Sequence, residues 1–126
     1  YEELRGLAKM TKCCLWTASQ TNRSGLNAEV ITMESISEAF NKCFVADFIF
    51  SLSRTMEDKQ TNSGRFYIAK NRNGPDGIVF DIFMDTSCVN IKIIDDQAQD
   101  PNVVMKNAVK KQEELLKEKY KIYKEQ

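Results

Sequence analysis

A strong turn signal lies between two apolar segments in the second half of the chain. Asn71–Gly77 reads NRNGPDG, so Asn-Gly is followed by Pro-Asp-Gly. Asparagine and glycine tolerate positive φ and proline fixes φ near −65°, which together favour a tight reversal. The flanking segments, Gly64–Lys70 (GRFYIAK) and Ile78–Met84 (IVFDIFM), are rich in β-branched and aromatic residues. The sequence therefore predicts a β-hairpin over residues 64–84.

Two short apolar runs precede the hairpin and predict strands buried on both faces. They are Cys13–Ala18 (CCLWTA) and Ala46–Ser53 (ADFIFSLS), and nearly continuous apolar runs are typical of parallel sheets. Cys88–Ile94 is a further strand candidate. The polar segments Ser19–Met33 and Arg54–Ser63 are expected to be loops.

Apolar residues recur at helical spacing in residues 1–8, in Glu34–Cys43 and from Asn102 onward. Asp100-Pro101 gives the last helix its entry signal, because proline suits the first helical position. No capping residue precedes Tyr1, so we expect the chain to open inside a helix of something longer. Residues 96–126 are expected to form an amphipathic tail whose apolar stripe its own domain, a second copy or a partner must cover.

The predicted order is helix, strand, long loop, helix, strand, hairpin and tail helix. This is an α/β arrangement with two parallel strands and an antiparallel extension. Two parallel strands are too few to bury the edges of such a sheet, so we expect an incomplete domain. The large aromatic residues fall at inward positions of these elements and are expected in the core. They are Trp16, Phe40, Phe44, Phe48, Phe50, Phe66, Phe80 and Phe83.

Composition narrows the function classes. Eighteen basic and eighteen acidic residues cancel, so no overall field attracts nucleic acid, and histidine is absent. None of the four cysteines forms a Cys-x-x-Cys pair, which argues against zinc. Cys13 and Cys14 are expected to be small core residues, with a redox thiol as the weaker reading, in a reducing compartment. No apolar run approaches the ~20 residues that span a bilayer, so we expect a cytoplasmic protein without a membrane partner.

Three segments resemble late motifs of DnaB-like replicative DNA helicases. Trp16–Gly25 (WTASQTNRSG) and Ile68–Gly77 (IAKNRNGPDG) carry the resemblance, and Ala46–Arg54 (ADFIFSLSR) is similar to the strand between them. From about Glu2 to Ile94 the sequence is most similar to helicases of T-even-type phages. The resemblance implies that residues 1–95 are the C-terminal portion of a RecA-like P-loop ATPase core. It further implies a hexameric, ATP-dependent motor in the host cell cytoplasm that acts on single-stranded DNA.

The front half of that ATPase core is missing from this sequence. No G-x-x-x-x-G-K-[ST] occurs, and the acidic strand end that would hold magnesium is absent as well. ATP and Mg are therefore expected in the intact protein, with neither bound tightly by this chain, which is predicted inactive alone. Where the bacterial enzymes have Arg-Glu-Ser-Gly in a DNA-facing loop, this sequence has Met33-Glu34-Ser35-Ile36.

Gln20, Lys70 and Arg72 are the candidate catalytic residues. Gln20 follows a predicted strand, where its amide can reach a terminal phosphate, and the resemblance implies a γ-phosphate sensor. It could equally satisfy loop backbone groups. Lys70 and Arg72 are two apart, so in an extended chain they point to the same side, ~7 Å apart. The resemblance implies that this pair reaches a neighbouring subunit's nucleotide in trans, whereas the alternative is a solvated hairpin end.

DNA contact is expected from the loop after the first predicted strand. Arginine, hydroxyl and free backbone N–H groups suit phosphate contact, which positions a strand without reading sequence. A flexible surface loop with a structural arginine is the alternative. The residues implied in DNA binding are Arg23, Ser24, Gly25, Asn27, Glu34 and Ser35.

Two other functions stay open. The amphipathic tail favours a non-enzymatic interaction module that docks on a helicase or replisome partner, and a primase or helicase loader is a possible partner. A RecA-type recombinase or a circadian-clock-like ATPase would share the core. The Lys-x-Arg-Asn-Gly-Pro hairpin counts against that second reading.

Overall fold

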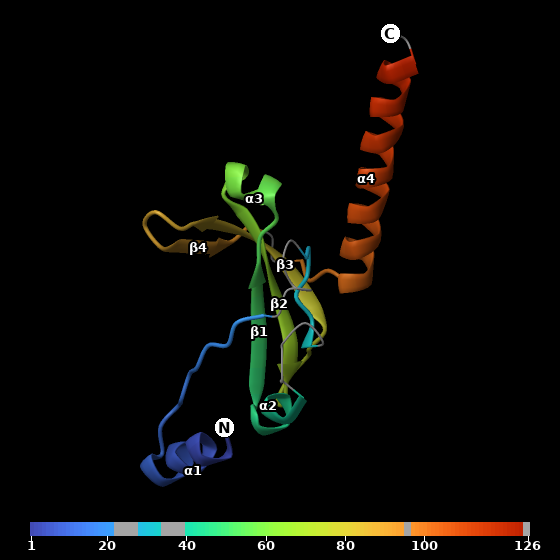
Figure 1. The fold of residues 1–126 in the computed structure, drawn as a ribbon. Coiled ribbons are helices and arrows are strands. Elements are labelled where there is room, and N and C mark those ends of the chain that lie inside the picture. The colour runs from blue at the N-terminus through green and yellow to red at the C-terminus, as the bar shows by residue number, and fades with distance from the viewer. Residues whose placement is uncertain (22–27, 34–39, 95–96, 125–126) are drawn as a thin grey trace.

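A four-stranded sheet forms the centre of the molecule. The computed structural model describes residues 1–21, 28–33, 40–94 and 97–124. In chain order the elements are α1 (Glu2–Thr11), α2 (Phe40–Val45), β1 (Phe48–Ser53), α3 (Met56–Thr61), β2 (Ser63–Asn71), β3 (Ile78–Asp85), β4 (Asn90–Ile93) and α4 (Pro101–Lys124). Figure 1 shows α1 and α2 near one end of the sheet and α3 at the other end.

The described strands pair in the order β1-β2-β3-β4, and every pairing is antiparallel. Phe66 faces Phe80 across the hairpin, and a register shift interrupts the β1–β2 ladder between Ile49 and Phe50. The predicted hairpin is confirmed, as are a strand within 46–53 and a short strand within 88–94. The fold is therefore mixed α/β, as expected at that level.

The hairpin loop is organised by Asn71. Its side-chain oxygen accepts from the Asn73 backbone N–H at 3.3 Å, and its amide donates to the Pro75 carbonyl at 3.3 Å. Gly77 has φ +70° and its N–H donates to the Ile68 carbonyl at 2.8 Å. Glycine is needed there because other residues adopt this backbone conformation only with strain.

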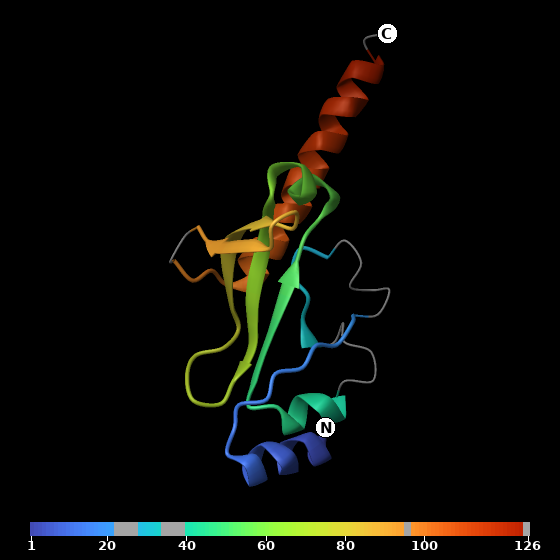
Figure 2. The same cartoon turned by 90° about the vertical axis from the view of Figure 1, so that its left-hand side faces the viewer.

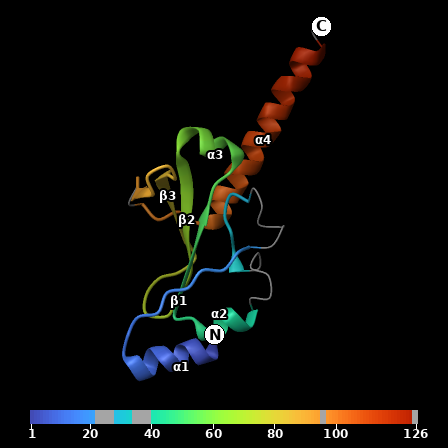
Figure 3. The same cartoon turned by 60° about the vertical axis from the view of Figure 1, so that its left-hand side comes forward.

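The predicted helices at both ends of the chain are confirmed. Pro101 is the first residue of α4, and the Asp100 side chain accepts from the Asn102 N–H at 2.7 Å. Beyond its first turns α4 leaves the sheet and projects away from it (Figure 3). Of the helix predicted over residues 34–43, only the part from residue 40 is described, and it belongs to α2.

The strand predicted at Cys13–Ala18 is wrong. These residues have no regular secondary structure and are exposed, and no parallel pairing occurs among the described strands. The segment nevertheless runs near β1 and in the same general direction (Figures 1 and 2). The Trp16 ring lies edge-on to Phe48 and Phe50, with centroid distances of 6.4 and 5.9 Å. A strand buried on both faces needs a covering layer on each side, and no described element supplies one here.

The loop predicted at Arg54–Ser63 contains the helix α3. Thr55 caps it, because its hydroxyl accepts from the Asp58 N–H while the Asp58 carboxylate accepts from the Thr55 N–H. Thr-x-x-Asp is a capping-box pattern. The sequence therefore contains a start signal for this helix, although the polar character of the segment favours a loop.

The core is small, and this corrects the expectation for the aromatic residues. Among the described residues the buried apolar ones are Val30, Ala69, Val79 and Ile82. Trp16, Phe44, Phe48 and Phe50 are exposed by 70%, 66%, 38% and 37%, and Phe66, Phe80 and Phe83 are half-buried. The burial of Phe40 lies outside the described part. Cys13 and Cys14 are exposed rather than core residues, and all four thiols are free.

The chain exposes a large surface for its size. Its accessible area is 9931 Å². A compact monomer of 14.5 kDa exposes roughly 6900 Å². Part of the excess comes from α1, in which no residue is buried, and part from β1, where Phe48 and Phe50 are 38% and 37% exposed.

Candidate functional site

Lys70 lies near the end of β2 and caps the helix α2. Its ammonium donates to the Cys43 carbonyl at 2.7 Å and to the Phe44 carbonyl at 3.4 Å. Carbonyls in the last turn of a helix have no partners within the helix and carry partial negative charge, so a cation is favoured there. Lys70 is half-buried by this contact.

Arg72 follows β2 and is held by Asp47, which precedes β1. The guanidinium Nη1 lies 2.6 Å from the Asp47 Oδ1, and the Arg72 backbone N–H donates to the Asp47 carbonyl at 3.0 Å. The pair faces solvent, since the Arg72 side chain is 44% exposed and that of Asp47 is 61% exposed. Such exposed ion pairs contribute little to stability.

Arg5 reaches the same carboxylate from α1. Its Nη1 donates to the Val45 carbonyl at 2.9 Å, and its Nη2 lies 3.3 Å from the Asp47 Oδ1. Arg5, Asp47, Lys70 and Arg72 are called the hairpin-end cluster below. Arg5 and Arg72 contact the Asp47 carboxylate and Lys70 holds the carbonyls of Cys43 and Phe44, so the cluster has three cations and one carboxylate. That arrangement favours a further anion.

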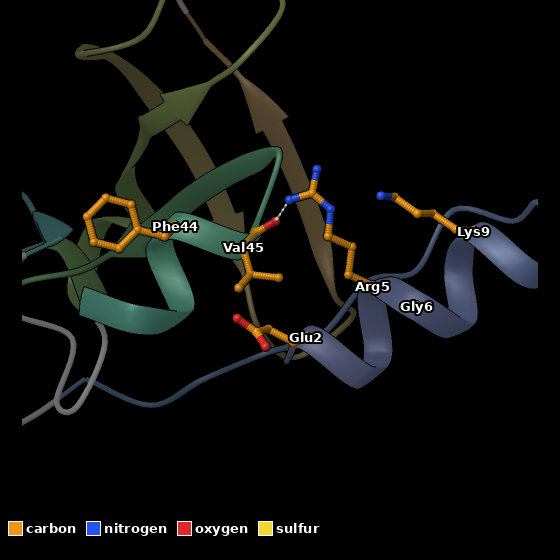
Figure 4. A pocket seen from close by; sticks show the side chains of 6 residues that line it. All are labelled: Glu2, Arg5, Gly6, Lys9, Phe44 and Val45. Atoms are coloured by element: carbon orange, nitrogen blue, oxygen red, sulfur yellow. Dashed lines mark hydrogen bonds between the residues drawn. The ribbon is translucent and has the colours of Figure 1, made fainter.

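A surface pocket of about 500 Å³ adjoins this cluster between α1 and α2. Figure 4 shows Arg5 and Lys9 projecting from the same side of α1, with Arg5 reaching the Val45 carbonyl. The lining residues are Glu2, Arg5, Gly6, Lys9, Phe44 and Val45. Its charged side chains are two cations, Arg5 and Lys9, and one carboxylate, Glu2, so the pocket lining carries one net positive charge.

Of the remaining predicted site residues, the structure describes Gln20, which is not joined to this cluster. Gln20 is exposed on the extended segment after Ala18, and no hydrogen bond within the described ranges links it to Lys70 or Arg72. The residues predicted to bind DNA all lie outside the described part. They are Arg23, Ser24, Gly25, Asn27, Glu34 and Ser35.

A second charged cluster lies at the opposite end of β1 and β2. The Arg65 Nη1 is 2.7 Å from the Asp58 Oδ2 and 2.7 Å from the Glu29 Oε2, and all three side chains are 27% exposed or less. The Glu29 oxygen has no partner with hydrogen-bond geometry, so its contact with Arg65 is an ion contact only. Arg65, Asp58 and Glu29 are called the α3-end cluster below.

The ionisation of Asp58 reflects its surroundings. Burial alone would raise its pKa, but hydrogen bonds from the Thr55 N–H and hydroxyl, together with Arg65, outweigh burial and lower the pKa to about 2. Ser63 donates to the second carboxylate oxygen at 3.0 Å. A carboxylate that accepts this many donors is stabilised in its charged form.

Sequence reasoning missed Arg5 and Asp47. Both contacts join residues about forty positions apart, and nothing local in the sequence marks such a pairing. Within the described part of the chain, no three cysteine, aspartate or glutamate side chains converge on a possible metal position.

None of the helices in the described ranges is long and apolar enough to span a membrane. α4 has 24 residues, but seven of them are lysines. No protein-family model matches the sequence, and no curated protein matches it either.

Proposed function

We propose that this chain is part of a hexameric, ATP-driven replicative DNA helicase. In this role Lys70 and Arg72 act on a nucleotide that is held by a neighbouring subunit. The observation that carries the proposal is the hairpin end itself, where both cations reach the same segment, Cys43–Asp47, beside an excess of positive charge. A transferring phosphoryl group spreads negative charge over its oxygens and is stabilised by such cations.

Within the strand arrangement, the antiparallel hairpin is the part that supports a RecA-like core. A RecA-like sheet needs a parallel neighbour at the outer edge of β1, followed by an antiparallel hairpin. β2 and β3 supply the hairpin, and Trp16 keeps residues 13–18 near β1 through contacts with Phe48 and Phe50.

The exposed surface supports an assembly. The accessible area exceeds that of a compact monomer by roughly 3000 Å², whereas one partner contributes only about 800 Å² to an interface of ordinary size. The half-covered aromatic side chains of β1 supply the apolar part of such an interface.

The remaining roles follow the same scheme. Gln20 senses the γ-phosphate at the end of the segment that joins the sheet. The backbone of single-stranded DNA is held by Arg23, Ser24, Gly25, Asn27, Glu34 and Ser35. ATP and Mg are supplied by the phosphate loop and acidic strand end of the intact subunit.

Lys70 and Arg72 already have partners within the chain, so the trans role requires an exchange. Arg72 must leave a carboxylate that is 61% exposed, a contact worth less than ~1 kcal/mol. Lys70 donates to two helix carbonyls and has one further N–H group to offer. Both side chains can therefore reach an incoming phosphate at small cost.

Trans-complementation tests the proposal directly. It uses a protein that carries this chain together with its phosphate loop. Arg72→Ala is expected to lower ATP hydrolysis by ~10³ or more while nucleotide binding persists. Subunits with an inactive phosphate loop but an intact Arg72 should restore turnover when mixed with the Arg72→Ala subunits, because each supplies what the other lacks.

The control variant is Lys92→Ala on the exposed strand β4, which should leave turnover unchanged. Arg65→Ala is unsuitable as a control, because it is expected to destabilise the fold. Failure of the mixed subunits to regain activity would contradict action in trans. The 126-residue chain alone is expected to show no ATP hydrolysis, and measurable turnover by it would also count against the proposal.

A non-enzymatic interaction module is the second candidate, and α4 favours it. Val109, Leu116 and Tyr120 of this helix are 55%, 56% and 66% exposed although they lie on its apolar side. A discrete stoichiometric complex with a replisome protein such as a primase or loader, lost on Leu116→Asp, would support the module. A monomer in the presence of such proteins would rule against it.

A further inference from the structure

We propose that Asp47 is a built-in counter-anion that occupies an oxyanion site formed by Arg5 and Arg72. Its natural competitor would be the terminal phosphates of a nucleoside triphosphate. The inference rests on the proposed function and deepens it. It adds Arg5 to the predicted Lys70 and Arg72 pair and gives the site a resting state.

Both guanidinium groups contact one oxygen. The Arg72 Nη1 is 2.6 Å and the Arg5 Nη2 is 3.3 Å from the Asp47 Oδ1, so the two nitrogens are less than 6 Å apart. A tetrahedral phosphate fits between donors at that separation and accepts from both at once. The two arginines are thus already positioned for a single oxyanion.

Each residue keeps a second anchor when the carboxylate is displaced. The Arg5 Nη1 stays on the Val45 carbonyl, and the Arg72 backbone N–H stays on the Asp47 carbonyl. The exchange therefore changes one side-chain contact on each arginine and leaves the backbone in place. No refolding is needed.

The surroundings favour the competitor. Asp47 is 61% exposed, so an incoming ligand can approach the site from solvent. Lys9 and Glu2 line the adjoining pocket with Arg5 and offset each other, so the surplus near Asp47 comes from Arg5, Lys70 and Arg72 (Figure 4). A polyphosphate carries more negative charge than one carboxylate and is attracted more strongly by this surplus.

In the proposed motor, Asp47 would control when Arg72 acts as the arginine finger, that is, as the arginine that reaches a neighbouring subunit's nucleotide. Without a neighbour's triphosphate, Asp47 neutralises Arg72 and holds it along its own chain. A triphosphate releases Arg72 toward the transferring group. The Asp47 carboxylate thereby restricts the action of Arg72 to subunit interfaces that hold a triphosphate.

Titration of the 126-residue chain with inorganic tripolyphosphate tests the proposal. The arginine Nε–Hε signals are followed by NMR, with oligothymidylate as a comparison ligand. Tripolyphosphate should shift Arg5 and Arg72 together. Asp47→Asn, which keeps the shape of the side chain and the backbone carbonyl, should tighten binding roughly two- to fivefold, as expected for the loss of exposed ion pairs.

Glu57→Gln is the matched control, because it removes an exposed carboxylate 3.5 Å from Lys111 and should leave affinity unchanged. Arg5→Gln should weaken binding, which tests the new member of the site without altering Asp47.

Equal affinity of wild type and Asp47→Asn for tripolyphosphate, with binding that still depends on Arg72, would overturn the role of Asp47 as a counter-anion and leave the proposed function standing. Tripolyphosphate shifts that are insensitive to Arg72→Gln would refute both. A preference for oligothymidylate would assign the cations to DNA and also overturn the inference.

Discussion

The two ends of the β1–β2 pair carry the same chemistry in different surroundings. At the α3 end, Arg65 meets Asp58 and Glu29 with side chains that are 27% exposed or less. At the hairpin end, Arg72 and Arg5 meet Asp47 with side chains that are 33% to 61% exposed. One cluster has surplus negative charge, and the other has surplus positive charge.

Burial, and not residue type, distinguishes the ion pairs of the α3-end cluster from those of the hairpin-end cluster. Buried charges lose water and must keep their partners, so breaking one is costly. Exposed charges regain water when they separate, so their partners can change. The α3-end cluster therefore supports the fold, whereas the hairpin-end cluster is suited to a ligand.

The largest expected effect is the removal of Arg65. Arg65→Met should lower the free energy of unfolding by about 2–3 kcal/mol, because it leaves Asp58 and Glu29 partly buried without a cation. Arg72→Met should cost less than about 1 kcal/mol. Urea unfolding followed by circular dichroism measures both. Equal losses for the two variants would break the comparison.

Acid unfolding gives the next largest effect. The pKa of Asp58 is lowered to about 2, against about 3.9 for an ordinary aspartate. A depressed folded-state pKa stabilises the protein above the unfolded value, and this stability disappears as the pH falls through the folded value. Roughly 2 kcal/mol should therefore be lost between pH 4 and pH 2. Asp58→Asn should start less stable and lose less in that window, and a parallel pH profile for the two proteins would contradict the assignment.

Lys70, the half-buried member of the hairpin-end cluster, gives the smallest of the three effects. Lys70→Met should destabilise the protein by about 1 kcal/mol, since it removes a charge-assisted hydrogen bond to the Cys43 carbonyl. Amide hydrogen exchange should quicken in α2 while β3 stays protected. Uniformly faster exchange would instead indicate that Lys70 supports the whole sheet.

The hairpin and the terminal helices could be predicted because their signals are local. Asn71–Gly77 supplies turn chemistry, and Asp100-Pro101 starts α4 within a few residues. The strand at Cys13–Ala18 could not be placed from its composition alone. An apolar run becomes a buried strand only when layers cover it, and that is a property of the whole assembly.

The site was predictable in part for the same reason. Two cations at alternate positions near a strand end can be read from the sequence, and both do reach the segment 43–47. Their partners cannot be read in this way. Asp47 and Arg5 come from elements about forty positions apart, and only the folded chain brings them to one carboxylate oxygen.

The exposed indole of Trp16 has a practical consequence. It is the sole tryptophan of the chain, it is 70% exposed, and it rests edge-on against two phenylalanines of the outermost strand. Any polypeptide that completes the sheet beside β1 must move this ring from water into an apolar environment. The protein thus carries its own fluorophore beside the outer edge of β1, and a blue shift of its emission would report the docking of such a polypeptide without a label.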